Sequence, residues 1–191
     1  MAVFLNLVGV CLLLGMWQPV CAESVSKDSY LNLGFNAQYF GYKEFDDQGV
    51  LLDREDGLMP GLVMEFGKDW NSISGAVRFE LIDGVVDYDG QTQAGVPVTT
   101  NTDERIVTLE ALIRYRLKQL PEFNLTVVGG LGHREWRRNI RATDITSSLY
   151  EVYAWRYWFL GGAATVWRNG QWSAGIDAGW LYPIKPNISI D

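Results

Sequence analysis

Hydrophobic and polar residues alternate one by one along most of the chain. The cleanest run places Val107, Leu109, Ala111, Ile113, Tyr115 and Leu117 on one face, with mostly polar residues between them. A period of two is that of a β-strand, whereas a helix would repeat every 3.6 residues. No stretch after residue 22 keeps a helical period over three turns, so the pattern predicts an all-β protein.

The same alternation predicts seven antiparallel strands. Their expected ranges are 30–42, 61–70, 73–88, 107–117, 123–132, 150–167 and 171–182. Long polar loops at 43–60, 89–104 and 134–148 alternate with short connections, one of them around Pro121. Long loops at one end and short turns at the other predict an up-and-down sheet that closes into a barrel.

The last predicted hairpin turns at Arg168-Asn169-Gly170-Gln171, because Asn-Gly favours a type I′ turn. Pairing Arg168 with Gln171 gives one face that is apolar throughout and aromatic at both ends. These aromatic rims are Tyr157, Phe159, Trp167, Trp172, Trp180 and Tyr182. Roughly ten residues separate the rims, about the length of one tilted membrane-spanning strand. A soluble sandwich or lipocalin-like barrel would turn this face inward, but aromatic rims favour lipid.

An earlier hairpin is predicted across Asn71-Ser72, with Trp70 paired to Ile73 and Glu65 opposite Arg78 as an ion pair. The polar faces of all the strands collect four acids and four arginines. They are Glu65, Arg78, Glu80, Glu110, Arg114, Arg116, Arg156 and Asp177. Balanced charge predicts an interior salt-bridge network that fills a narrow barrel. A narrow ion path is the alternative.

The third predicted loop is basic and contains one tryptophan. Its candidate site residues are Arg134, Trp136, Arg137, Arg138 and Arg141. Arginines pair in a forked geometry with phosphates, so this loop is a candidate contact for lipopolysaccharide. The alternative is a solvated loop without a ligand.

Residues 1–22 have the features of a secretory signal peptide, with an apolar run followed by Val20-Cys21-Ala22 as the cleavage site. A lipoprotein anchored through Cys21 is the weaker alternative. Cys11 and Cys21 are the only cysteines, so the mature chain is expected to contain no disulfide and no thiol nucleophile. The net charge of −7 provides no basic surface for nucleic acid.

No catalytic constellation is apparent. His133 is the only histidine, no serine follows it closely, and the alternation puts it on the apolar side of its strand. The carboxylates on the polar faces are matched by arginines. The arginines lower the pKa values of these carboxyl groups, which are then poor general acids. The acidic residues of the first predicted loop lack the spacing of a calcium loop. We therefore expect no enzyme, no metal site and no cofactor.

From Tyr30 to Tyr182 the pattern resembles the small outer-membrane barrels of the OmpA and OmpX type. The resemblance implies eight or more strands, so residues 23–191 would form a barrel domain that lacks its C-terminal part. It also implies the outer membrane of a Gram-negative bacterium, contact with its lipid and lipopolysaccharide, and insertion by the barrel-assembly machinery. The expected role is structural or in surface interaction. A narrow channel or porin and a soluble periplasmic lipocalin-like binder are the alternatives.

Overall fold

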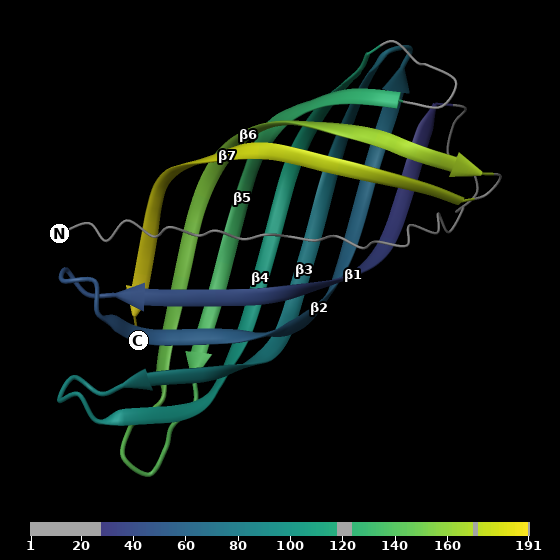
Figure 1. Ribbon diagram of the computed structural model, residues 1–191. Helices are drawn as coiled ribbons and strands as arrows, with labels where there is room; N and C mark the ends of the chain where they lie inside the picture. The colour runs from purple at the N-terminus through teal and green to yellow at the C-terminus, as the bar shows by residue number, and fades with distance from the viewer. Residues whose placement is uncertain (1–27, 118–123, 170–171, 191) are drawn as a thin grey trace.

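The computed structural model describes residues 28–117, 124–169 and 172–190, which form one antiparallel sheet of seven strands (Figure 1). The strands are β1 (Ser29–Phe45), β2 (Leu51–Trp70), β3 (Ile73–Gln91), β4 (Pro97–Arg116), β5 (Asn124–Ile140), β6 (Leu149–Asn169) and β7 (Trp172–Ile190). Each strand pairs with its sequence neighbours, which confirms the predicted all-β, up-and-down order. The edge strands β1 and β7 are not paired with each other, so the sheet is not closed.

Within the described ranges, no helix is long and apolar enough to cross a membrane. The predicted signal peptide with Cys11 and Cys21, and the connection around Pro121, lie outside the described residues.

The strands are longer than predicted, and Figure 1 shows them bending along their length into a curved sheet. β4, for example, has 20 residues. The predicted long loops shrink to residues 46–50, 92–96 and 141–148, so most of the first two and nearly half of the third are strand instead. The prediction was wrong because charged and polar residues lie on both faces of these segments and obscure the alternation, although the backbone ladder continues through them.

The predicted hairpin at Asn71-Ser72 is confirmed. Trp70 pairs with Ile73, and Met64 pairs with Phe79 further along the ladder. Asn71 has a φ of 55°, a left-handed conformation that asparagine tolerates better than most residues. A tight turn with such a residue fixes the register of β2 against β3.

The predicted register of the last hairpin is wrong. Asn169 pairs with Trp172, and a further shift lies between Thr165 and Trp167. A bulge adds one residue to one strand, and a one-residue slip moves every later side chain to the other face. Residues 170–171 of the predicted turn lie outside the described part of the chain.

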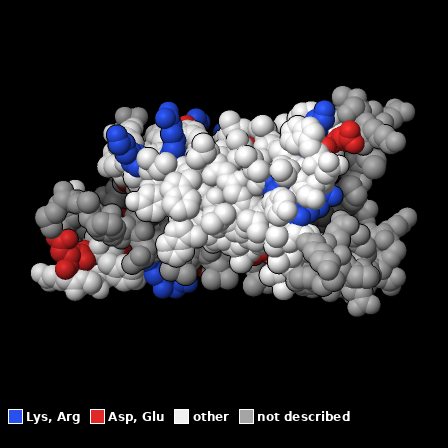
Figure 2. Space-filling view, turned by 90° about the horizontal axis from the view of Figure 1, so that it is seen from above, with Lys and Arg blue, Asp and Glu red and all other residues white. Residues whose placement is uncertain are grey.

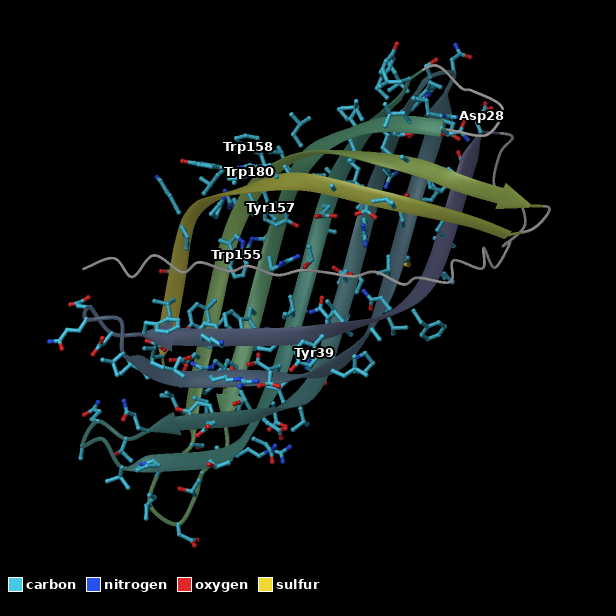
Figure 3. The ribbon with its side chains drawn as sticks, in the orientation of Figure 1. Asp28, Tyr39, Trp155, Tyr157, Trp158 and Trp180 are labelled. Atoms are coloured by element: carbon cyan, nitrogen blue, oxygen red, sulfur yellow. The ribbon has the colours of Figure 1, made fainter. Side chains whose placement is uncertain are left out.

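This slip changes the predicted aromatic rims. Trp180 and Tyr182 pair with Leu160 and Trp158 on the outer face, whereas Tyr157 is buried on the inner face. Figure 3 shows Trp158 and Trp180 on the outer side of the sheet and Trp155 on its inner side. Phe159 is on the inner face too, beside Tyr157 at a ring-centroid distance of 6.2 Å. The side chains of Trp167 and Trp172 are outside the described part.

β7 also continues beyond its predicted end at Tyr182. Pro183 and Pro186 lie within it, as an edge strand allows, because proline has no N–H to donate to a ladder. A second irregularity in the β6–β7 pairing lies nearby, and Lys185 adopts a φ of 47° there.

The two faces of the sheet differ sharply in polarity. The outer face carries exposed apolar residues in a belt next to the short turns, and Figure 2 shows a broad uncharged surface with charges toward its ends. We call it the apolar belt: Phe35, Leu58, Leu62, Met64, Phe66, Val77, Phe79, Leu109, Ile113, Leu131 and Leu160. Phe35 is 85% exposed and Ile113 is 66% exposed.

The inner face holds the buried residues. A hydrophobic cluster lies in the half of the sheet away from the short turns and consists of Phe40, Tyr42, Met59, Ile82, Val86, Ile106 and Trp136. Charged residues are buried on the same face, including Glu55, Glu65 and Arg138. The side of the sheet that is shielded from solvent therefore carries buried ionic groups as well as the hydrophobic cluster.

Candidate functional site

The most connected polar group of the inner face is built around Arg138 of β5. Its Nη2 lies 2.9 Å from Asp53 Oδ2, its Nη1 lies 2.7 Å from Glu151 Oε2, and its Nε lies 3.1 Å from Glu55 Oε1. Asp53 and Glu55 belong to β2, while Glu151 belongs to β6. One guanidinium thus links β5 to its neighbour β6 and, across the concave face, to β2.

We define the Arg138 cluster as Arg138 with Asp53, Glu55, Thr102, Glu104, Trp136 and Glu151. Strand register explains its assembly, because Glu104, Arg138 and Glu151 are direct cross-strand partners on β4, β5 and β6. Asp53 and Glu55 alternate with outward residues on β2 and so share the inner face. The curvature of the sheet then brings β2 over this row.

Aromatic rings enclose the cluster. The Trp136 ring stacks on Tyr153 at 4.7 Å and meets the edges of Phe40 and Tyr42 at 5.7 and 5.4 Å between centroids. The guanidinium of Arg138 lies over Tyr42, at 4.9 Å from its centroid. Rings that exclude water strengthen the electrostatic interactions they surround.

Charge is unbalanced inside this enclosure. Four carboxyl groups, those of Asp53, Glu55, Glu104 and Glu151, accompany the single guanidinium of Arg138, and each of the five residues is buried. Thr102 Oγ1 donates to Glu55 Oε1 at 2.6 Å, and Trp136 Nε1 donates to Glu104 Oε2. Two carboxyl oxygens, Asp53 Oδ1 and Glu104 Oε1, have no donor among the described residues.

The cluster lies outside the apolar belt, since the outward neighbours of Glu104 are the ion-paired Asp103 and Arg105. Burial, reinforced by the nearby Glu55 carboxylate, raises the pKa of Glu104 to about 9. Burial also raises the pKa of Glu55, although Arg138 opposes that shift. Burial alone would lower the pKa of Arg138, but the surrounding carboxylates outweigh it and raise the pKa instead.

A second polar group lies on the inner face nearer the short turns. Arg114 binds Glu65 with an Nη2–Oε2 distance of 2.7 Å, and the Tyr30 hydroxyl donates to Glu65 at 3.1 Å. Arg78 is opposite Glu65 as predicted, but its ion-pair partner is Glu80, at 3.8 Å. The predicted Glu65–Arg78 ion pair is therefore wrong, because the guanidinium of Arg114 occupies both oxygens of Glu65.

The other predicted interior residues divide into two groups. Glu110 accepts a bond of 2.6 Å from the Tyr157 hydroxyl, and Arg116 pairs with Asp69 at 3.1 Å. Arg156 is exposed and pairs in the ladder with the outward His133, so the register shift removes it from the interior. Asp177 is exposed on the edge strand β7.

The residues predicted as a basic loop belong mainly to β5 and point alternately to its two faces. Trp136 and Arg138 are buried within the Arg138 cluster, and Arg134 lies over the ring of Trp155 at 6.0 Å. Contact with lipopolysaccharide at an outer rim does not fit these three inward residues. Arg137 and Arg141 are exposed and pair with Glu135 and Asp103.

Sequence reasoning missed the four acids of the Arg138 cluster. Asp53 and Glu55, like Thr102 and Glu104, are two residues apart in segments interpreted as loops. Their spacing is that of one strand face and was the available signal.

No group of three or more His, Cys, Asp or Glu side chains in the described part could hold a metal ion. Comparison with protein-family models, with curated proteins and with solved structures finds no match to this chain.

Proposed function

We propose that this chain is an integral outer-membrane β-barrel protein whose interior is filled by ion pairs, with a structural or surface-interaction role. One observation carries the proposal: the outer face bears a belt of exposed apolar side chains, whereas charged side chains are buried on the inner face. Ile113 and Leu131 are 66% and 64% exposed, whereas Glu55 and Arg138 are 0% and 2% exposed. A protein surrounded by water has the opposite arrangement.

The dimensions of the apolar belt support lipid contact. On β4 the outward apolar positions run from Val107 to Tyr115, and charged residues begin at Arg105. Nine residues rising about 3.3 Å each, tilted by about 40°, cover about 20–25 Å, close to the apolar band of outer-membrane barrels. Trp70 and Tyr115 border the belt at the short turns, where amphipathic rings favour the membrane–water interface.

A soluble lipocalin-like binder is the less favoured alternative. Such a barrel lines its interior with apolar side chains to bind an apolar ligand. The inner face here carries Glu65 with Arg114 and the whole Arg138 cluster beside its hydrophobic cluster. In hydrocarbon the edges of β1 and β7 must also be paired, because open sheet edges are not stable there.

The Arg138 cluster favours a plugged barrel over a narrow channel. It joins β2, β5 and β6 across the concave face, and each of its residues is buried. Outside the belt, Arg105, Arg137 and Arg141 point outward and are candidates for pairing with phosphates of lipopolysaccharide. Insertion would then use the barrel-assembly machinery.

Fractionation of cells that express the full chain tests the proposal. We expect the protein in the outer-membrane fraction, extracted only by detergent, with a gel mobility that changes on boiling. A protein that stays soluble without detergent and shows no mobility change would refute it. Single-channel recording in planar bilayers separates the alternatives within the membrane class, and we expect no steady conductance from a plugged barrel.

A further inference from the structure

Glu104 is a buried carboxyl group, and one of its two oxygens lacks a hydrogen-bond partner among the described residues. Its side chain is 1% exposed, and Oε2 accepts from the indole of Trp136. Oε1 has no donor among the described residues, although a buried carboxylate oxygen normally has one. The Glu55 carboxyl group is within hydrogen-bonding reach of Glu104. Two acids that face each other cannot bond unless one of them carries a proton.

The surroundings supply too little positive charge to keep every acid ionised. The titratable or charged groups that face Glu104 and its partners are Tyr42 and Glu44 on β1, Asp53 and Glu55 on β2, Tyr88 on β3, Arg138 on β5, and Glu151 and Tyr153 on β6. Arg138 is the one cation in this set, and it bonds Asp53, Glu55 and Glu151 but not Glu104. A buried charge without a partner is far costlier than a neutral acid.

We propose that Glu104 is a proton-binding site: at neutral pH it is a neutral carboxylic acid that donates from Oε1 to the Glu55 carboxylate. The bound proton makes Oε1 a hydrogen-bond donor and lowers the negative charge of the cluster by one. On deprotonation the O–H bond of Glu104 breaks, the proton leaves to water, and two carboxylates face each other. Glu55 can be the acceptor because Thr102 and Arg138 already stabilise its negative form.

The proton couples the Arg138 cluster to pH. The pKa of Glu104 is raised to about 9 in the folded chain, above the ordinary value for glutamate. The proton is therefore bound more tightly in the folded state, and stability falls as pH rises from about 4.5 to 9. Alkaline pH should loosen the contacts of Trp136 and Arg138 first. This inference concerns the inner face alone and holds whether or not the apolar belt meets lipid.

Urea unfolding in detergent micelles between pH 5 and 9 tests the proposal. The experiment compares the full wild-type chain with the variant Glu104→Gln. The amide of glutamine can donate to Glu55 and accept from Trp136, as the neutral acid does. We expect the unfolding equilibrium constant of the wild type to carry a component that rises by up to about tenfold per pH unit, and E104Q to lack it. Glu135→Gln on the exposed outer face is the matched control and should keep it.

Infrared spectroscopy at neutral pH reads the proton directly. A protonated carboxyl group has a carbonyl stretch distinct from those of amides and carboxylates, and its pH titration in the wild type needs no variant to fold. We expect this band in the wild type and in E135Q, and its loss in E104Q. A wild type without the band, or a band that persists in E104Q and disappears only in Glu55→Gln, would overturn the assignment. Both experiments can be run in plain buffer if the chain is soluble, so failure of the membrane proposal is distinguishable.

Discussion

Replacement of Arg138 by methionine tests whether the Arg138 cluster holds the inner face together. Methionine keeps most of the apolar stem but removes the guanidinium. Asp53, Glu55 and Glu151 then lose their shared partner while they stay buried. The substitution therefore isolates the charge from the packing of the side chain.

The expected magnitude follows from the contacts. Arg138 bonds three carboxyl groups, and a hydrogen bond to a charged group contributes about 1.5–3 kcal/mol, which gives an upper bound of about 5–9 kcal/mol. The acids left without a partner can bind protons. This limits the loss of unfolding free energy to about 3–5 kcal/mol, the range for breaking a buried ion pair. We expect the loss to shrink as pH falls, because protonation removes the uncompensated charge.

The assay is urea unfolding of the full chain in detergent micelles, followed by tryptophan fluorescence. Arg137→Met is the matched control, since Arg137 is the next residue on β5, exposed and paired with Glu135 at 2.6 Å. An exposed ion pair contributes little to stability, so this control should remain close to the wild type. A loss for R138M no greater than that for R137M would refute the structural role of the cluster.

Two further predictions concern the outer and inner faces nearer the short turns. Ile113→Arg places a charge within the apolar belt and should weaken folding into lipid vesicles by about 2–4 kcal/mol in urea titrations; an unchanged free energy would argue against lipid contact. Gly132→Ala would place a Cβ against the ring of Tyr157, so the ring must shift and its hydroxyl loses its hydrogen bond to Glu110. We expect the free energy of unfolding to fall by about 1–3 kcal/mol. Gly34→Ala, which has open space around it, is the control and should be close to neutral.

The sequence predicted the sheet well where the two faces of a strand differ in polarity. Between Val107 and Arg116 the alternation fixed both the strand and its faces, and Asn71 fixed the neighbouring hairpin. Periodicity is visible there because one face is apolar and the other polar.

Prediction failed where that contrast disappears. Around Asp53 and Glu104 both faces are polar, so composition indicated loops although the strands continue. The candidate site lies in this region, which explains why its acids were missed. At the last hairpin, the bulge near Thr165 moved Tyr157 to the inner face, and counting from a turn cannot detect an added residue.

Lipid contact by the apolar belt is tested most directly by nitroxide spin labels along β4. Cys11 and Cys21 are the only cysteines, so a chain that starts at Glu23 can carry one introduced cysteine at each position from 103 to 115. We expect labels at odd positions from 107 to 115 to collide with oxygen and not with a water-soluble nickel chelate, and labels at 103 and 105 to collide with the chelate. Even positions should be shielded from both. Chelate access at 107–115 equal to that at 103 would show water around the belt and contradict a membrane barrel.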